Sequence, residues 1–234
     1  DLVHDTVVLA LRAWHSFAPG TSLRSWLLKI LHNRFHSLKR RKHLSSEVAR
    51  DDLESLNALR PLNAYGYSKY LFDQYAVRQA DRDEAPPQWA GLKFFNVYGP
   101  NEGHKGGMKS VVAQIWPKVA AGETVTLFRS HNPNYADGGQ MRDFVYVDDV
   151  VDIIEFLLQS PRVSGIFNAG SGQARSFADL ARATFDAAGK TPSIDYVDTP
   201  LSIRDRYQYF TEARMDRIRA AGFEGQSTPL EEGV

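Results

Sequence analysis

The fold is decided by a short stretch, Tyr65-Gly66-Tyr67-Ser68-Lys69, which opens a periodic apolar segment. The apolar residues continue at Tyr70, Leu71, Tyr75 and Val77. This spacing predicts a helix that begins close to Tyr65. Tyr65 and Lys69 are four residues apart, so their side chains lie on one face of that helix. A phenol keeps its proton up to about pH 10, but a neighbouring ammonium favours the phenolate, so the pair can act as an acid or base near neutral pH.

Two further blocks follow this helix. Residues 92–100 read Leu-Lys-Phe-Phe-Asn-Val-Tyr-Gly-Pro, which predicts a strand running into a turn. Residues 101–108 form a Gly-rich loop in which no hydrophobic periodicity would bury Lys105. Lys105 is therefore either a solvated surface charge or a functional amine, and its place in the loop favours function.

A third block, residues 141–150, reads Met-Arg-Asp-Phe-Val-Tyr-Val-Asp-Asp-Val. Its centre alternates like a strand, and Asp148 or Asp149 is expected to cap the helix that follows. Arg142 stands just ahead of this strand, and a guanidinium in that position suits bidentate contact with a diphosphate.

The segment 167–172 needs separate treatment because it places Gly170 and Gly172 between a strand and a helix. That pattern is similar to a dinucleotide fingerprint, but Arg175 occupies the position of the third glycine. Ser176 and Asp179 have the spacing of a helix capping box. We therefore interpret this segment as a loop of the substrate-binding side.

Composition places the chain among ordinary globular proteins, with 43% hydrophobic and 24% charged residues in 234. The absence of Cys excludes disulfides, thiolate metal sites and Cys nucleophiles. No apolar run is long enough to span a bilayer and no signal peptide opens the chain, so a cytoplasmic protein without membrane contact is expected.

The zero net charge hides a split, because residues 1–43 hold eight Lys and Arg against two Asp. Apolar spacing predicts two helices there, and the second ends in the basic run Lys39-Arg40-Arg41-Lys42. The run is either a solvated helix end, where positive charge is favourable, or a contact to nucleic acid. His32 and His36 lack a third ligand and are interpreted as surface residues, so no metal site is predicted.

The amino-acid sequence of this first part resembles region 2 of bacterial sigma factors of the extracytoplasmic-function type. The resemblance is carried by residues 1–6, 17–27 and 30–35. It implies contact with RNA polymerase or promoter DNA through residues 1–43. We predict an α-helical segment over residues 1–48 and a separate part with its own fold over residues 49–234.

The three later blocks, with Tyr-x-x-x-Lys ahead of them, resemble the extended short-chain dehydrogenase family. The segment Gly103-His104-Lys105-Gly106 narrows the resemblance to the epimerases of ADP-linked heptoses that serve lipopolysaccharide synthesis. The family implies an α/β fold of Rossmann type and inversion of C6 of ADP-glycero-manno-heptose by transient oxidation. It further implies NADP as cofactor, with NAD as the alternative, an ADP-sugar substrate and a homo-oligomer.

The resemblance also assigns roles to individual residues. Tyr65 and Lys105 would be the acid/base pair, one for each face of the substrate. The cofactor would be bound by Lys69, Val97 and Lys105. The substrate would be bound by Asn96, Gly107, Gln114, Phe128, Arg129, Ser130, His131, Arg142 and Tyr207. Gly107 and Gln114 replace a Ser and a His of the family.

The chain departs from the family ahead of Tyr65. No Gly-rich strand-turn-helix precedes this residue, although the family binds the pyrophosphate of NADP on such a turn. The expected fold is thus an incomplete Rossmann-type domain without the cofactor-binding strands, and the chain by itself is expected to be inactive. Two alternatives remain, an epimerase or dehydratase of UDP- or dTDP-sugars and a promoter-binding or polymerase-binding module.

Overall fold

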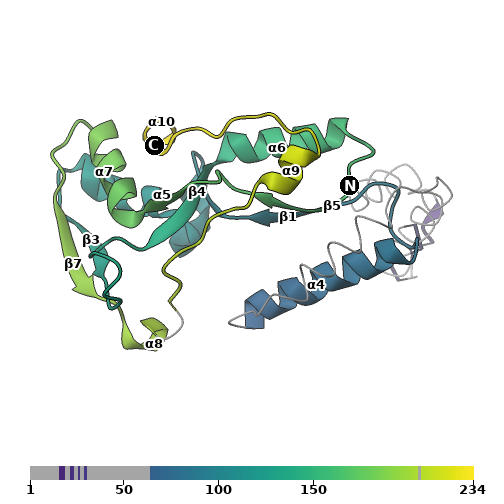
Figure 1. The fold of residues 1–234 in the computed structure, drawn as a ribbon, viewed down its shortest axis with the longest axis horizontal. Helices are drawn as coiled ribbons and strands as arrows, with labels where there is room; N and C mark the ends of the chain where they lie inside the picture. Colours follow the sequence, from purple (N-terminus) through teal and green to yellow (C-terminus); the bar gives the residue numbers. More distant parts are fainter. Residues whose placement is uncertain (1–15, 19–21, 24–25, 27–28, 31–63, 205–206) are drawn as a thin grey trace. The chain divides into compact units, whose positions relative to one another are not determined.

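A computed structural model describes residues 16–18, 22–23, 26, 29–30, 64–204 and 207–234 (Figure 1). The chain divides into two compact units. The first contains the described residues up to Ala90 together with Arg162–Gly165, and the second contains Gly91–Pro161 and Ile166–Val234. The predicted helices, the basic run and the His pair of the first 48 residues lie almost wholly outside the described residues.

Helix α4, Ala64–Asp81, dominates the described part of the first unit. It begins one residue before Tyr65, which confirms the helix predicted from the apolar spacing. Val77 and Ala80 are fully buried. Asp83, with φ at 56°, adopts the left-handed conformation as the chain leaves the helix, and an Asp accepts this conformation more readily than most residues.

Three small sheets form the second unit. The first pairs β1, Ala90–Phe94, with β5, Gly165–Ala169. The second has the order β2, Asn96–Tyr98, then β4, Met141–Tyr146, then β6, Ala174–Ser176, with β2 and β4 parallel. The third pairs β3, Val125–Arg129, in parallel with β7, Ile194–Asp198. The α/β class predicted from the sequence is confirmed.

The strand predicted over residues 92–100 is broken at Phe95 into β1 and β2, which belong to different sheets. The Phe95 amide donates to the carbonyl of Ala169, while the Val97 amide donates back to the carbonyl of Phe95 at 2.9 Å. This local turn changes the pairing partner within one residue. Asn96 and Val97 are thereby delivered to β4, opposite Phe144 and Val145.

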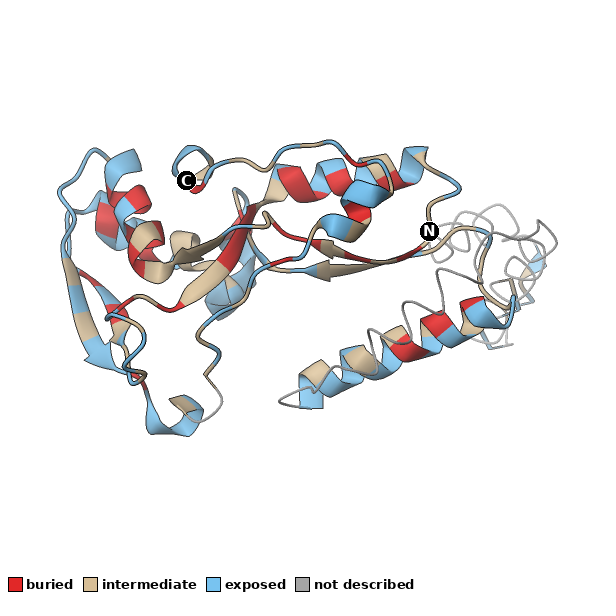
Figure 2. Cartoon of the chain, viewed as in Figure 1, coloured by how far each residue is buried: buried red, intermediate tan, exposed pale blue. Residues whose placement is uncertain are grey.

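Helices cover the sheets of this unit (Figure 1). The longer ones are α5, Val111–Ala120, α6, Val147–Gln159, and α7, Phe177–Ala187. The short ones are the 3-10 helix η2, Glu102–Met108, with α8, Leu201–Arg204, α9, Asp216–Ala220, and α10, Leu230–Gly233. Buried residues concentrate on α7 and β4 (Figure 2). The core there includes Val125, Phe144, Leu180 and Phe185. No helix in the described ranges is both long and apolar enough to cross a membrane.

The helix starts test two sequence predictions. Ser176 accepts from the Asp179 amide and Asp179 accepts from the Ser176 amide, which confirms the predicted capping box of α7. The capping prediction for α6 is wrong, because its N-cap is Tyr146 and no side chain caps it. Asp149 lies within the first turn and accepts hydrogen bonds from Thr228. The centre of β4 is also continuously buried, as in parallel strands covered on both faces.

Candidate functional site

The Tyr65 and Lys69 pair lies on the first turns of α4. The Lys69 ammonium is 5.2 Å from the centre of the Tyr65 ring, within the range of a cation–π contact. The Ser68 hydroxyl donates to the backbone carbonyl of Tyr65 at 2.8 Å, within the first turn of the helix. The ring is 73% exposed, so its hydroxyl is open to a ligand. The helical spacing thus brings the two side chains together as predicted.

Asn96 and Val97 lie on β2, where the parallel pairing with β4 holds them. Asn96 is exposed and Val97 half-buried. The following residue, Tyr98, is buried, and its hydroxyl has no partner in the described part of the chain. Burial raises the pKa of Tyr98 to about 12, with nearby Asp149 as the next contribution. Tyr98 therefore remains a neutral phenol under all ordinary conditions.

Lys105 and Gly107 lie on η2. The Lys105 ammonium is 3.3 Å from Oε2 of Glu102, three residues earlier. Gly106, with φ at 55°, breaks the helical geometry directly after Lys105, and glycine takes that conformation without strain. A side chain at Gly107 would meet no atom within 4 Å, so the loop is open on that side.

Gln114 lies on α5, and its side chain donates to the carbonyl of Lys109 at 2.7 Å. The amide therefore closes the turn between η2 and α5. Its amide oxygen is accessible to solvent, since the residue is exposed. The structure gives Gln114 a local role, and its predicted substrate contact stays a prediction.

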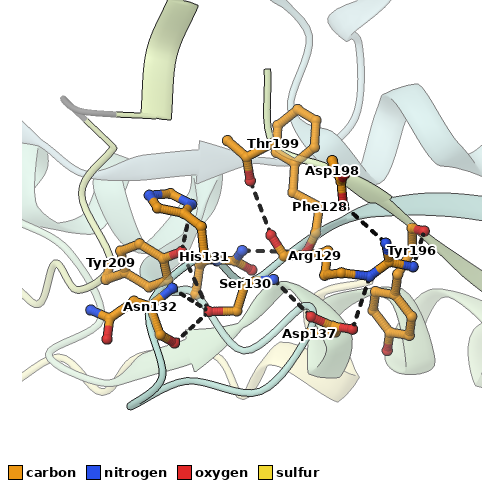
Figure 3. Close-up of polar contacts among 11 residues, drawn as sticks. Phe128, Arg129, Ser130, His131, Asn132, Asp137, Tyr196, Asp198, Thr199 and Tyr209 are labelled. Carbon is orange, nitrogen blue, oxygen red and sulfur yellow. Dashed lines mark hydrogen bonds and ion pairs between the residues drawn. The ribbon is translucent and has the colours of Figure 1, made fainter. Parts of the chain in front are cut away.

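The predicted segment from Phe128 to His131 leaves the end of β3, and most of its backbone groups are held by other elements (Figure 3). Phe128 accepts from the Gly138 amide and from the Gln140 side chain. The other contacts join the Arg129 carbonyl to Thr199, the Ser130 amide to Asp137, and the His131 amide to Tyr209. This segment is a platform that is anchored by three other segments, residues 137–140, Thr199 and Tyr209.

His131 and Tyr209 form the tightest polar pair of this platform (Figure 3). The Tyr209 oxygen lies 2.8 Å from the His131 amide and 2.8 Å from Nδ1 of the ring. The opposite nitrogen, Nε2, lies 3.1 Å from the carbonyl of Arg204. A carbonyl only accepts, so Nε2 carries a proton and Nδ1 of the neutral ring accepts from the Tyr209 hydroxyl.

Arg142 and Tyr207 complete this part of the site. The Arg142 guanidinium lies 5.7 Å from the centre of the Phe177 ring and 5.5 Å from that of Tyr207. Tyr207 in turn meets the rings of Phe128 and His131 edge to face, each at 6.2 Å. The structure therefore brings together Phe128, His131, Arg142 and Tyr207. The family resemblance had assigned these residues, from three separate segments, to substrate binding.

The charge of Arg142 is not neutralised within the described residues. Its guanidinium donates to the carbonyl of Met141, and no described carboxylate pairs with it. Burial lowers the pKa of Arg142, and burial raises the pKa of Tyr207 against the opposing effect of Arg142. A half-buried guanidinium without an acidic partner, flanked by aromatic rings, is suited to a phosphate that carries a flat base.

The Gly-x-Gly loop after β5 is occupied by an internal carboxylate. Oxygens of Asp143 accept from the amides of Ser171, Gly172 and Ala213 and from the Ser171 hydroxyl, at 2.7–2.9 Å. In a phosphate-binding loop such amides would point at the ligand. Here they hold β4 to the following loop, which agrees with the interpretation that this segment is not a dinucleotide-binding turn.

Sequence reasoning missed Tyr209 and Glu102 as parts of the site. Tyr209 stands two residues after Tyr207, and in extended backbone this spacing places both rings on one face. That alternation was a usable signal. Glu102 carried a weaker signal, because its spacing from Lys105 brings the two together only in a helix, which the Gly-rich sequence did not predict.

The described residues fit one end of a nicotinamide dinucleotide. The exposed ammonium of Lys69 beside Tyr65 suits the hydroxyls of a ribose. The described residues offer no Gly-rich turn for the pyrophosphate, since the amides of Ser171 and Gly172 are bonded to Asp143. Within the second unit Arg142 can bind a diphosphate and Lys105 offers an amine. Within the first unit Tyr65 and Lys69 offer a phenol and an amine.

Curated relatives extend over most of the chain. A protein of Nitratidesulfovibrio vulgaris strain DP4 named ADP-L-glycero-D-manno-heptose-6-epimerase is 50% identical over 184 residues, which are 79% of this chain and 56% of the relative. One of the same name from Fusobacterium nucleatum is 47% identical over 187 residues, 77% of this chain and 55% of the relative. The chain thus spans little more than half the length of these relatives.

Solved structures give the same fold. A UDP-glucose 4-epimerase of Thermus thermophilus in complex with NAD is 29% identical, with a TM-score of 0.59 over 74% of this chain and 52% of that chain. An ADP-L-glycero-D-manno-heptose-6-epimerase of Helicobacter pylori is 24% identical, with a TM-score of 0.63 over 88% of this chain and 60% of that chain. The Rossmann-type fold expected from the sequence is confirmed.

Two family models match the chain, and they divide it much as the charge pattern does. Residues 1–44 match Sigma-70 region 2, the resemblance that the sequence analysis found. Residues 33–170 match a second family model. This range contains α4, β1, β2 and β4, and therefore Asn96 and Arg142. By that match, together with the relatives above, the chain belongs to the NAD dependent epimerase/dehydratase family.

Proposed function

We propose that residues 49–234 form the substrate-binding and proton-transfer part of an epimerase that inverts C6 of ADP-glycero-manno-heptose. The observation that carries this proposal is the guanidinium of Arg142 between the rings of Phe177 and Tyr207, which pairs with no carboxylate among the described residues. It offers charge to a diphosphate, while the rings beside it offer faces and edges to a base. The relatives at about half identity carry the name of this activity.

The substrate in this proposal lies along the platform of Phe128–His131. Arg142 binds the diphosphate, and Tyr207 with Phe128 and His131 contacts the nucleoside end. Asn96, Gly107 and Gln114 contact the sugar. Because Gly107 is open on its side-chain face, the loop has room for a heptose with its extra carbon.

NADP, with NAD as the alternative, supplies reversible hydride transfer at C6 when bound. Lys69 would hold its ribose, and Val97 and Lys105 would contact its nicotinamide end. Tyr65 takes the proton of the C6 hydroxyl as it is oxidised, helped by the Lys69 ammonium over its ring. Lys105 gives a proton to the ketone oxygen on the opposite face. Inversion of one centre requires two such groups, one for each face of the sugar.

The test is a chimera in which the aligned residues of this chain replace those of the Nitratidesulfovibrio vulgaris relative over 184 residues. We expect the chimera to interconvert the two ADP-heptose epimers. Tyr65→Phe and Lys105→Met should each lower kcat by about 100-fold or more, with little change in substrate affinity. Lys118→Met, an exposed lysine on α5, is the control. An inactive chimera that binds NADP and ADP-heptose would rule the proposal out.

A second function is favoured by the Sigma-70 region 2 match over residues 1–44. We propose that residues 1–48 form a separate helical part that contacts nucleic acid or RNA polymerase. The basic run from Lys39 to Lys42 would release counterions from phosphates, so affinity should fall steeply with salt. Replacing these four residues by Gln should reduce the slope of log affinity against log salt by about 3 to 4. Fluorescence anisotropy with a promoter duplex measures this, and salt-independent binding would speak against it.

A further inference from the structure

The 3-10 geometry of η2 explains why Glu102 and Lys105 meet. A 3-10 helix has three residues per turn, so side chains at i and i+3 lie directly above one another. In an α-helix the same pair would be offset around the axis. Gly106 breaks the helix immediately afterwards, so Lys105 is the last residue of the turn that Glu102 begins.

Glu102 is an unusual residue for an exposed loop because it is 6% exposed, whereas its neighbours from Gly103 to Met108 are all exposed. Its Oε2 accepts from the Ser110 amide at 2.8 Å and from the Lys105 ammonium at 3.3 Å. The other oxygen, Oε1, is buried and has no partner among the described residues. A buried carboxylate is costly unless charged and hydrogen-bonded groups compensate it.

Lys105 is the cation that compensates this carboxylate. The titratable side chains that share the pocket of about 460 Å³ around Glu102 are Lys109, Tyr98 and Tyr146. None of these bonds to Glu102 within the described ranges. The Lys105 side chain itself is 42% exposed. The amine therefore has one fixed contact and keeps its remaining N–H groups free for a ligand.

We propose that Glu102 is the positioning residue for Lys105: the Glu102 carboxylate holds the Lys105 side chain at a fixed place from which it can donate a proton. The proposal rests on the function proposed above, in which Lys105 transfers a proton at C6. Lys105 then starts as the acid and Tyr65 as the base. The proton that Lys105 gives to the oxygen leaves a neutral amine, which Glu102 helps to reprotonate from solvent.

The test measures the amine directly and needs no catalysis. The full chain is treated with acetic anhydride at several pH values between 7 and 9, and acetylation of each lysine is followed by mass spectrometry. Glu102→Gln keeps an oxygen for the Ser110 amide but removes the charge. We expect acetylation of Lys105 to rise about fivefold, because an ion pair that shields the amine is lost. Labelling of Lys109 and Lys118 should not change.

Two further measurements separate the possible outcomes. Glu102→Asp keeps the charge but shortens the reach, so it should restore part of the protection, which a purely structural role would not. Unchanged Lys105 labelling in Glu102→Gln, with an unchanged circular dichroism spectrum, would overturn the proposal. In the active chimera Glu102→Gln should lower kcat more than it changes KM, whereas equal kcat in both proteins would also overturn it. An inactive chimera bears on the proposed function alone, because the labelling result does not depend on turnover.

Discussion

Asp143 illustrates at the scale of one residue how a buried charge organises the site. It has no exposed surface, and its two oxygens accept from three backbone amides and one hydroxyl. Arg142, its neighbour on β4, faces the aromatic rings instead. Because side chains alternate along the strand, Asp143 stabilises the fold while Arg142 points to the candidate ligand site.

Replacing Asp143 by Asn should lower the free energy of unfolding by about 3 kcal/mol. The amide would present N–H groups to amides that can only donate, so at least one donor would lose its acceptor. Urea denaturation followed by circular dichroism measures the loss. Asp148→Asn, an exposed position of α6, is the matched control and should cost less than about 1 kcal/mol. Equal losses in the two variants would contradict this account.

Glu102 predicts a pH dependence with a definite sign. Burial alone raises the pKa of Glu102, but hydrogen bonds from Ser110 and Lys105 outweigh it and lower the pKa below its ordinary value of 4.5. The stability that this carboxylate contributes is therefore present above pH 4.5 and is lost as the pH falls through the lowered pKa. Wild type and Glu102→Gln should differ most in unfolding free energy near pH 6 and converge towards pH 3. A difference in unfolding free energy that grew as the pH fell would contradict this prediction.

Among the elements, the capping box of α7 offers a clean test of local structure. Ser176 accepts from the Asp179 amide at 2.9 Å. Ser176→Ala should lower the unfolding free energy by about 1 kcal/mol, because one amide at the helix start loses its acceptor. Ser202→Ala, at an exposed position of the short helix α8, should have almost no effect. Thermal unfolding of both variants provides the measurement, and a larger loss at Ser202 would refute the comparison.

The elements also show what could be predicted from the sequence. Helix α4 and the capping box were predicted because both depend on spacing within a few residues. The break of the strand at Phe95 was missed because it depends on the carbonyl of Ala169, more than seventy residues away in the chain. The prediction that an Asp caps α6 was wrong, because the helix begins before Asp149 and the carboxylate of Asp149 instead accepts a hydrogen bond from Thr228. Local patterns predict local structure, whereas a distant partner cannot be read from them.

The residues of the candidate site also divide into those that could be predicted from the sequence and those that depend on distant partners. The residue types of Arg142 and Tyr207 were suggestive, and the resemblance named both, but only the fold brings them to 5.5 Å. The anchors of the Phe128 platform, Thr199 and Tyr209, were not predicted at all. Each acts through a backbone group of another segment, and a hydrogen bond to a distant backbone leaves no periodic mark in the sequence.

The whole molecule combines two parts with opposite charge, since the excess of basic residues before position 44 is balanced by an acidic remainder. The two family models divide it similarly, with an overlap at residues 33–44. Within the second unit the platform, Arg142 and Tyr207 come from β3, β4 and the segment after α8, so every proposed contact to the ADP part of the substrate lies in one compact unit. Tyr65 and Lys69 belong to the other.

This division predicts that ADP binding and proton transfer can be separated by substitution. Arg142→Gln should weaken ADP binding by about 10- to 100-fold, because a charge-assisted contact to the diphosphate is lost. Tyr65→Phe and Lys69→Gln should leave the ADP affinity within about twofold, since both lie in the unit without the proposed contacts to ADP. Isothermal titration calorimetry at constant ionic strength measures all three, with Arg182→Gln on the exposed side of α7 as the charge control. If Tyr65→Phe weakened ADP binding as strongly as Arg142→Gln, the nucleotide site would have to extend to α4, and the assignment of ADP to the Arg142 platform alone would be wrong.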